Sequence, residues 1–124
     1  MTIQILLIDD DPVVNFIHSR IIQDKFPDHP IFTFQNGLTA IEYIKQNPHY
    51  SYLIFLDINM PIMDGWKFLE TIAEDETKYD LQIHVLTSSL DPEDKSRASN
   101  NKQILSYINK PLKSNNLKDL LKYK

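Results

Sequence analysis

The sequence predicts an α/β fold in which a doubly wound, open sheet of five parallel strands carries helices on both faces. Five short apolar runs recur along the chain, and a helix-length segment follows each of them. Because such alternation implies right-handed crossovers, the strands are expected to be parallel. The 124 residues fit one domain, so we expect a single unit over residues 1–124. The runs are Ile3–Ile8, Ile31–Phe34, Tyr52–Leu56, Ile83–Leu86 and Ile104–Ile108.

The composition of the runs separates central strands from edge strands. Ile3–Ile8, Tyr52–Leu56 and Ile83–Leu86 are almost continuously apolar, which is typical of strands buried on both faces of a parallel sheet. The other two runs are interrupted by polar residues, Thr33 in one and Ser106 in the other. We therefore expect these two runs at the edges of the sheet.

The first helix is expected to begin after Asp11, which is a good N-cap, with Pro12 in its first turn. Apolar residues then recur at i, i+3, i+7 and i+8, which predicts one buried stripe. That stripe consists of Val14, Ile17, Ile21 and Ile22.

Three further helices follow from their caps and breakers. The second ends before Pro48, and the third spans Gly65–Glu74 behind Asp64 as its N-cap. Asp91 and Pro92 begin a fourth helix. Its nine residues from position 92 to 100 include only alanine as an apolar residue besides the proline, so it should be the least anchored.

A fifth helix is expected at the C-terminal end of the chain. Ser114 is a suitable N-cap, and leucines recur behind it at helical spacing. The leucines expected to face the core are Leu117, Leu120 and Leu121.

Composition and charge exclude several classes of protein. The chain has no cysteine, which rules out disulfides and thiolate metal sites. No apolar run reaches the ~18 residues that span a bilayer, and the N-terminus lacks the basic start of a signal peptide. A net charge of −4 argues against a direct nucleic-acid partner. We therefore expect a cytoplasmic protein without a membrane partner.

Polar residues gather where four of the predicted strands end. Asp9 and Asp10 follow the first strand, Asp57 the third, Thr87 the fourth, and Lys110 the fifth. In a doubly wound sheet, ligands bind beyond the carboxyl ends of the strands. Carboxylates, a hydroxyl and an ammonium group are thus expected at one edge.

This set of groups suits phosphoryl chemistry. Carboxylates a few Å apart repel one another, so they share a proton or bind a hard cation, and Mg²⁺ takes such oxygen ligands. A lysine and a hydroxyl opposite the carboxylates complete a cradle for a phosphoryl group. An aspartate in such a cradle can itself be the nucleophile and become an acyl phosphate.

Rival motifs do not match. The spacing after Asp57 breaks the EF-hand pattern at its third ligand, and no glycine-rich phosphate loop or G-x-S-x-G elbow is present. The four histidines show no metal-ligand spacing: they are His18, His29, His49 and His84.

The sequence resembles the receiver domains of two-component response regulators, and it is similar in length to the single-domain chemotaxis type. Leu56–Gly65 is the most specific stretch, and it is supported by Ile8–Pro12, Leu86–Ser88 and Asn109–Pro111. The resemblance covers essentially the whole chain. It implies a flavodoxin-like fold with strand order 2-1-3-4-5 and no output domain.

The resemblance also implies a role for each matching residue. Asp57 would be the phosphoacceptor, and its carboxylate would join the Mg²⁺ site. Asp10 would bind the metal directly, Asp9 through water, and the backbone carbonyl of Asn59 would be a further ligand. Thr87 and Lys110 would contact the phosphoryl group, with a cis bond between Lys110 and Pro111. Tyr107 would follow Thr87 as part of the switch.

We therefore expect a signalling switch, rather than an enzyme, that takes a phosphoryl group from a histidine kinase or phosphotransfer protein. Its downstream partner is expected on the face formed by the fourth helix, the fifth strand and the fifth helix, made of Asp91–Asn100, Tyr107 and Lys113–Lys122. An aspartyl-phosphate phosphatase of the haloacid-dehalogenase type would need a second acid where Asn59 stands. A receiver whose pocket is not used is the third alternative.

Overall fold

The structure is a computed structural model that describes residues 3–75, 77–118 and 120. Over these residues, five strands alternate with four α-helices, and a short 3-10 helix, η1, follows the last strand. No described helix is long and apolar enough to cross a bilayer. The elements are β1 (Ile3–Ile8), α1 (Pro12–Lys25), β2 (Ile31–Phe34), α2 (Gly37–Gln46), β3 (Ser51–Leu56), α3 (Gly65–Glu74), β4 (Asp80–Thr87), α4 (Pro92–Ser99), β5 (Ile104–Asn109) and η1 (Ser114–Leu117).

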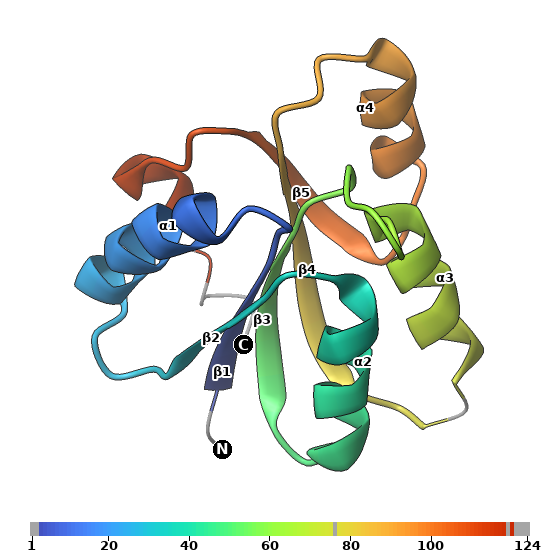
Figure 1. Ribbon diagram of the computed structural model, residues 1–124, viewed down its shortest axis with the longest axis horizontal. Coiled ribbons are helices and arrows are strands. Elements are labelled where there is room, and N and C mark those ends of the chain that lie inside the picture. Colours follow the sequence, from blue (N-terminus) through green and yellow to red (C-terminus); the bar gives the residue numbers. More distant parts are fainter. Residues whose placement is uncertain (1–2, 76, 119, 121–124) are drawn as a thin grey trace.

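The strands form one parallel sheet in the order β2-β1-β3-β4-β5. This confirms the predicted order and the two predicted edge strands. Figure 1 shows α1 and η1 on one face of the sheet and α2 and α3 on the other, and α4 contacts β5. The strand order reverses between β1 and β3, and in such sheets ligands bind beyond the carboxyl ends of the strands at this point.

Two apolar cores lie between the sheet and its helices. Side chains of β1 alternate between them, since Leu6 and Ile8 pack with the α2 and α3 side whereas Ile5 and Leu7 pack with the α1 and η1 side. All of β3 is buried, and so is β4 from Gln82 onward. Burial on both faces confirms the interpretation of the continuous apolar runs as central strands.

Each aspartate predicted as an N-cap accepts a backbone N–H from the first turn of its helix. These residues are Asp11 for α1, Asp64 for α3 and Asp91 for α4. α2 begins in the same way at Asn36. Side-chain oxygens thus fix the start of each α-helix in the segment that follows the carboxyl end of a strand.

α1 turns a different face to the core from the one predicted. Ile17 is 51% exposed, whereas Asn15, His18 and Ile22 are buried. The reason is that α1 packs on strand ends and loops whose backbone groups need polar partners, and apolar side chains cannot supply them. The predicted stripe of Val14, Ile17, Ile21 and Ile22 is therefore wrong at Ile17, whereas Ile22 is buried, Ile21 packs half-buried against the core and Val14 is half-buried.

The predicted fifth helix is replaced, in the described part of the chain, by η1. The Asn116 side chain accepts a 2.9 Å hydrogen bond from the N–H of Lys113, so Lys113 rather than Ser114 precedes the first turn. Such local side-chain bonds compete with helix formation. Leu117 and Leu120 are buried as expected, and Leu121 lies outside the described residues.

β4 begins at Asp80, earlier than the predicted Ile83. Asp80 pairs with Ser51 of β3, and the Ser51 hydroxyl donates a 2.6 Å hydrogen bond to the Asp80 carboxylate. This side-chain bond extends the parallel ladder beyond the apolar run from which the strand was predicted.

Candidate functional site

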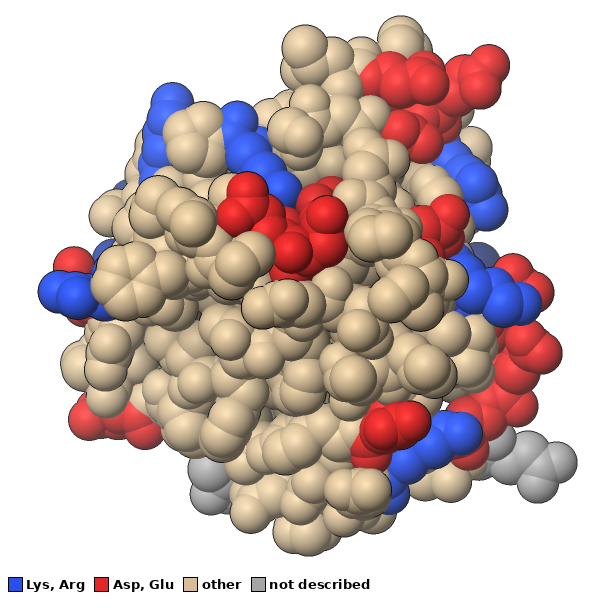
Figure 2. Space-filling view, in the orientation of Figure 1, with Lys and Arg blue, Asp and Glu red and all other residues tan. Residues whose placement is uncertain are grey.

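Three aspartates come together where β1 and β3 end. The N–H of Asp57 donates to the carbonyl of Ile8 at 3.0 Å, and the N–H of Asp9 donates to the carbonyl of Phe34 at 3.0 Å. These backbone bonds bring Asp9, Asp10 and Asp57 to one edge, where one carboxylate oxygen of each lies within 4.8 Å of the others. Figure 2 shows acidic side chains gathered on this face of the molecule, beside basic ones.

Lys110 brings a positive charge to these carboxylates. Its N–H donates to the carbonyl of Thr87 at 2.9 Å, which anchors the residue just after β5. Its Nζ lies 3.0 Å from Asp57 Oδ2 and also forms a salt bridge with Asp9 Oδ2. Burial lowers the pKa of Lys110, but the bonds to Asp9 and Asp57 outweigh burial and raise it above 10.5. The predicted cis bond to Pro111 is confirmed.

Asp57 is buried among these groups, with 4% of its surface exposed. Burial raises the pKa of its carboxyl above 3.8, and the N–H of Asn59 and the Lys110 ammonium oppose that rise. The Asn59 N–H donates to Asp57 Oδ1 at 3.1 Å. The two oxygens of Asp57 therefore face different partners, a backbone amide and a lysine.

Gly65 lets the start of α3 pass directly under the loop that follows β3. A Cβ at this position would lie 2.7 Å from the carbonyl oxygen of Asp57 and 2.7 Å from the Cα of Ile58. Its N–H donates to the Ile58 carbonyl at 3.1 Å. Only glycine permits this close approach, so the residue fixes the backbone that carries Asp57.

The donor set fits a hard divalent cation. Asp9 and Asp57 are buried carboxylates, Asp10 is exposed, and together they offer three oxygens at ligand spacing. Mg²⁺ favours such oxygens and keeps several waters, which the exposed side of the group can accommodate. The contact observed for Asn59 is made by its backbone N–H, so the role of its backbone carbonyl as a metal ligand stays a prediction.

Thr87 is fully buried at the end of β4, next to the loop that leads to α4. Its hydroxyl accepts a 3.2 Å hydrogen bond from the N–H of Ser89. The Ser89 hydroxyl donates to Asp94 of α4 at 2.7 Å and accepts from the Asp91 N–H at 3.3 Å. Thr87 is thus linked to the first turn of α4 through a single residue.

Tyr107 reaches the same loop from β5. Its hydroxyl donates a 3.4 Å hydrogen bond to the carbonyl of Ser89, and the Asn109 side chain donates to that carbonyl at 3.1 Å. Burial raises the pKa of the Tyr107 hydroxyl, so it stays a neutral donor. The structure therefore brings Tyr107 into contact with the loop that follows Thr87, and its switch role stays a prediction.

Sequence reasoning missed two residues that support the site from α1. The Asn15 amide donates to the carbonyl of Asp9 at 2.9 Å and to that of Phe34 at 3.4 Å. His18 Nε2 accepts a 3.3 Å hydrogen bond from the N–H of Leu112, just beyond Pro111. Their spacing could have indicated this role, because Asn15 and His18 lie three residues apart on the same helix face as the buried Ile22.

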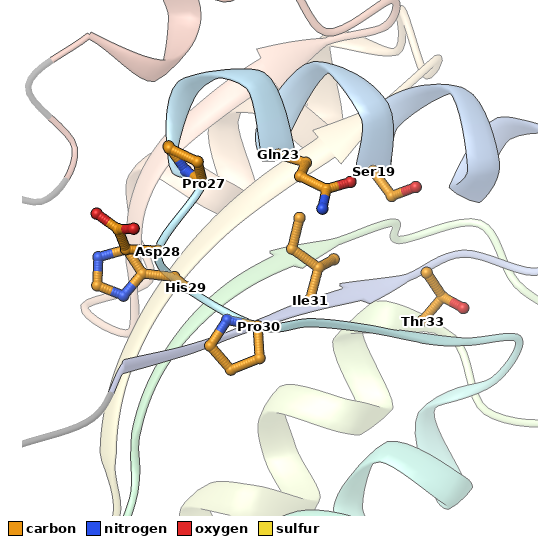
Figure 3. Close-up of a pocket in the computed structure, with 8 residues that line it drawn as sticks. All are labelled: Ser19, Gln23, Pro27, Asp28, His29, Pro30, Ile31 and Thr33. Carbon is orange, nitrogen blue, oxygen red and sulfur yellow. The ribbon is translucent and has the colours of Figure 1, made fainter.

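A separate hollow of about 470 Å³ lies between α1 and β2, as Figure 3 shows. It opens beside the segment that joins these two elements, and none of the site residues lines it. We assign it no role in the site. Its lining residues are Ser19, Gln23, Pro27, Asp28, His29, Pro30, Ile31 and Thr33.

Comparisons with known proteins identify the family of the chain. Residues 5–122 match the family described as the response regulator receiver domain. The response regulator Rcp1 of Synechocystis sp. is 31% identical over 123 residues, which cover 95% of this chain and 81% of that protein. The probable C4-dicarboxylate response regulator DctR of Priestia megaterium is also 31% identical, but this chain spans only 49% of its length.

Solved structures give the same result. A two-component response regulator from Cytophaga hutchinsonii has a TM-score of 0.86 at 31% identity, over 98% of this chain and 96% of that one. A CheY-like receiver domain protein from Methanospirillum hungatei has a TM-score of 0.75 at 27% identity, over 93% of this chain and 87% of that one. The chain therefore belongs to the response regulator receiver domains, the switches of two-component phosphorelay signalling.

Proposed function

We propose that Asp57 accepts a phosphoryl group from the phosphohistidine of a histidine kinase or phosphotransfer protein, and that the resulting acyl phosphate changes which partner the domain binds. The observation that carries this proposal is the position of Asp57. It is a buried carboxylate in contact with Lys110 and within ligand spacing of Asp9 and Asp10. Its partners hold this carboxylate in place, and the residue two positions later, where an aspartyl-phosphate phosphatase would need a second acid, is Asn59.

The transfer needs little from the protein beyond position and charge. An oxygen of Asp57 forms a bond to phosphorus as the phosphorus–nitrogen bond of the donor breaks, and the electron pair returns to the donor imidazole. Lys110 lies on Oδ2 and can pair with a phosphoryl oxygen as negative charge leaves the carboxylate. The Thr87 hydroxyl, near the end of the neighbouring strand, supplies a further hydrogen bond once it leaves Ser89.

A divalent cation completes the cradle. Asp10 and Asp57 would bind Mg²⁺ directly and Asp9 through water, with the Asn59 carbonyl as the third protein ligand. When bound, the ion offsets the charge of the carboxylates and of the phosphoryl oxygens. When no ion is bound, the ammonium group of Lys110 supplies the positive charge that contacts Asp9 and Asp57 among the described residues.

The phosphoryl donor must cover the rim of the site, because a transfer brings its histidine into contact with Asp57. Large apolar side chains are exposed on that rim, on the first turns of α1 and on the loops that follow β3 and β4. We propose that they form the docking surface of the donor. They are Val13, Phe16, Ile17, Ile62 and Leu90.

We propose that the signal leaves through α4, β5 and the segment that follows β5. α4 buries only Ala98, so few contacts hold it in place. Ser89 connects it to Thr87, and Tyr107 connects the same residue to β5. A pull on Thr87 by the acyl phosphate would therefore reposition this surface, and the partner is a second signalling protein. Lys122, at the end of the predicted face, lies outside the described residues.

The test is the intact mass of the protein after incubation with Mg²⁺ and acetyl phosphate. A gain of one phosphoryl group that is absent from Asp57→Asn supports the proposal. No gain would indicate a receiver whose pocket is not used. Turnover of many phosphate esters would instead indicate a phosphatase, and it would contradict the role of a switch.

A further inference from the structure

We propose that His18 is a positioning residue for Lys110, whose ammonium group it holds opposite Asp57 through the backbone of Leu112. The hydrogen bond of 3.3 Å from the Leu112 N–H to His18 Nε2 is the contact on which this depends. The link to phosphoryl transfer rests on the proposed function, whereas the hydrogen bond and the placement of Lys110 can be tested without it.

The chain around Lys110 is held from both sides. On one side the N–H of Lys110 is bonded to the carbonyl of Thr87. Two residues later the N–H of Leu112 is bonded to His18, and between them Pro111 has a fixed φ. The backbone that carries the lysine side chain therefore has little freedom. If His18 released Leu112, the segment after Pro111 would lose its polar anchor.

α1 also holds Asp9, the second carboxylate that pairs with Lys110. The Asn15 amide donates to the carbonyl of Asp9, and His18 lies one turn further along the same buried face. The Asp9 carboxylate and the Lys110 ammonium form a salt bridge with each other. One helix face thus sets the position of both charged groups relative to one another, through Asn15 on one side and His18 on the other.

The chemistry of the ring makes a specific requirement. An imidazole nitrogen accepts a hydrogen bond only when it carries no proton, so His18 must be neutral, with its proton on Nδ1. His18 is 4% exposed. Burial and the charge of Lys110 lower its pKa below 6.5, while Asp9 raises it to a lesser extent, so the ring is neutral at pH 7.

Within the part of the chain that the structure describes, the other elements packed against α1 (β1, β2 and η1) add no further charged group at the ring. The described residues of η1, Ser114–Leu117, carry no charge, and the flanking Lys113 and Lys118 are exposed. As the pH falls through the lowered pKa of His18, the ring takes a second proton and Nε2 becomes a donor. The Leu112 N–H then loses its acceptor.

The first experiment is ¹⁵N-detected NMR of the histidine rings, with the Leu112 amide followed as the pH falls from about 8 to 5. We expect His18 with its proton on Nδ1, and a Leu112 amide shift that moves at the pH where His18 titrates. A proton on Nε2 at pH 7, or a Leu112 amide that ignores the titration, would overturn the proposal.

The second experiment compares rates of phosphorylation by acetyl phosphate with Mg²⁺. His18→Leu should be slower by about 10- to 100-fold at pH 7.5, as misplaced groups in a phosphoryl-transfer site usually are. His18→Gln, whose side-chain oxygen can accept from Leu112 without titrating, should restore the rate. The phosphorylation rate of His18→Gln should also fall less at acid pH than the rate of the native protein, because glutamine does not become protonated as His18 does.

His84→Leu is the matched control: His84 is another buried histidine, it stacks on Phe55 of the core on the α1 and η1 side, and no contact joins it to Lys110 among the described residues. It should leave the rate unchanged while the protein is folded. A folded His18→Leu protein that reacts as fast as the native protein would refute the proposal. If the native protein takes no phosphoryl group, the proposed function fails, and the crystal structure of His18→Leu decides the inference by whether Lys110 Nζ has left Asp57.

Discussion

The side-chain amide of Asn109 donates a 3.1 Å hydrogen bond to the backbone carbonyl of Ser89. The hydroxyl of Tyr107 donates to the same oxygen at 3.4 Å. Two residues of β5 thus hold the loop between β4 and α4, while the Ser89 side chain holds the first turn of that helix through Asp94. The N–H of the same Ser89 donates to the Thr87 hydroxyl, so Thr87 and β5 are both bonded to the backbone of one residue.

Asn109→Ala should therefore make the loop more mobile before any phosphorylation. A net hydrogen bond contributes about 0.5–1.5 kcal/mol, so local opening should increase about 2- to 12-fold. Amide hydrogen exchange of residues 88–95 measures this directly. Asn115→Ala, which truncates an exposed asparagine in η1, is the control and should leave exchange there unchanged. Equal exchange in the Asn109 variant would show that Tyr107 alone holds the loop.

Asp10→Ala should weaken Mg²⁺ binding by at least about tenfold, because it removes a ligand from a site with few. In metal-free buffer the same change should raise Tm, since it relieves repulsion with Asp9 and Asp57. The gain should shrink as salt screens the charges. Asp28→Ala removes the same charge from an exposed residue in the turn after α1, away from the site, and should do neither. A lower Tm for Asp10→Ala without metal would contradict the claim of repulsion.

The strand ends were predictable because parallel strands in a doubly wound sheet place their carboxyl ends at one edge. That rule located Asp9, Asp57 and Lys110 from sequence alone, and the structure brings them into contact. The face that α1 buries was not predictable from apolar spacing. That face depends on backbone groups of distant loops, to which Asn15 and His18 form hydrogen bonds. The hydropathy of the sequence does not indicate where those backbone groups lie.

The C-terminal segment shows the same limit in another form. Leucine spacing after Ser114 predicted a helix, and the burial of Leu117 and Leu120 agrees with the predicted inward face. The local bond between Lys113 and Asn116 nevertheless makes the first turn a 3-10 helix. A pattern of apolar residues indicates which side chains are buried, but a single side-chain hydrogen bond can determine the backbone conformation of the residues that carry them.

Ile62→Asn should stabilise the protein. Ile62 has a φ of 70°, which β-branched residues rarely adopt, and it is 83% exposed, so its side chain gains little from burial. The N–H of Met63 donates to the carbonyl of Pro61 at 2.8 Å, which closes a γ-turn around it. Asparagine tolerates positive φ, and relief of the strain should add about 1 kcal/mol, or about 3–5 °C in Tm. Ile62→Val retains the branch and should bring no gain; an asparagine variant that melts lower would show that the turn is not strained.

His84 should make stability depend on pH below neutrality. Its ring is 1% exposed, contacts the Ser106 hydroxyl at 2.6 Å and stacks on Phe55. Burial lowers its pKa from 6.5 to about 4, so the unfolded chain binds more protons between these values. The stabilisation is complete above pH 6.5 and is lost as the pH falls toward 4, by about 3 kcal/mol.

Urea denaturation at intervals from about pH 7.5 to 4 measures this loss. In His84→Leu, the free energy of unfolding should fall less steeply as the pH falls. The decrease that remains should include a contribution of the same sign from His18, because burial also lowers the pKa of His18. An unchanged slope in the His84 variant would show that its ring becomes protonated in the folded state without cost.

Beryllofluoride, which imitates the phosphoryl group on Asp57, should change amide exchange across residues 88–108. α4 has a single buried residue, Ala98, so the free energy that separates its positions is small, about 1–3 kcal/mol by the usual size of allosteric coupling. The mimic offers Lys110 and the Thr87 hydroxyl a new acceptor, which draws Thr87 away from the Ser89 N–H. Residues 37–46 of α2, on the far side of β3, serve as the internal control, and Asp57→Asn should show no response at all. If only the loops that carry Asp9, Asp57 and Lys110 respond, then α4 and β5 do not form the output surface, because the coupling ends at the site itself.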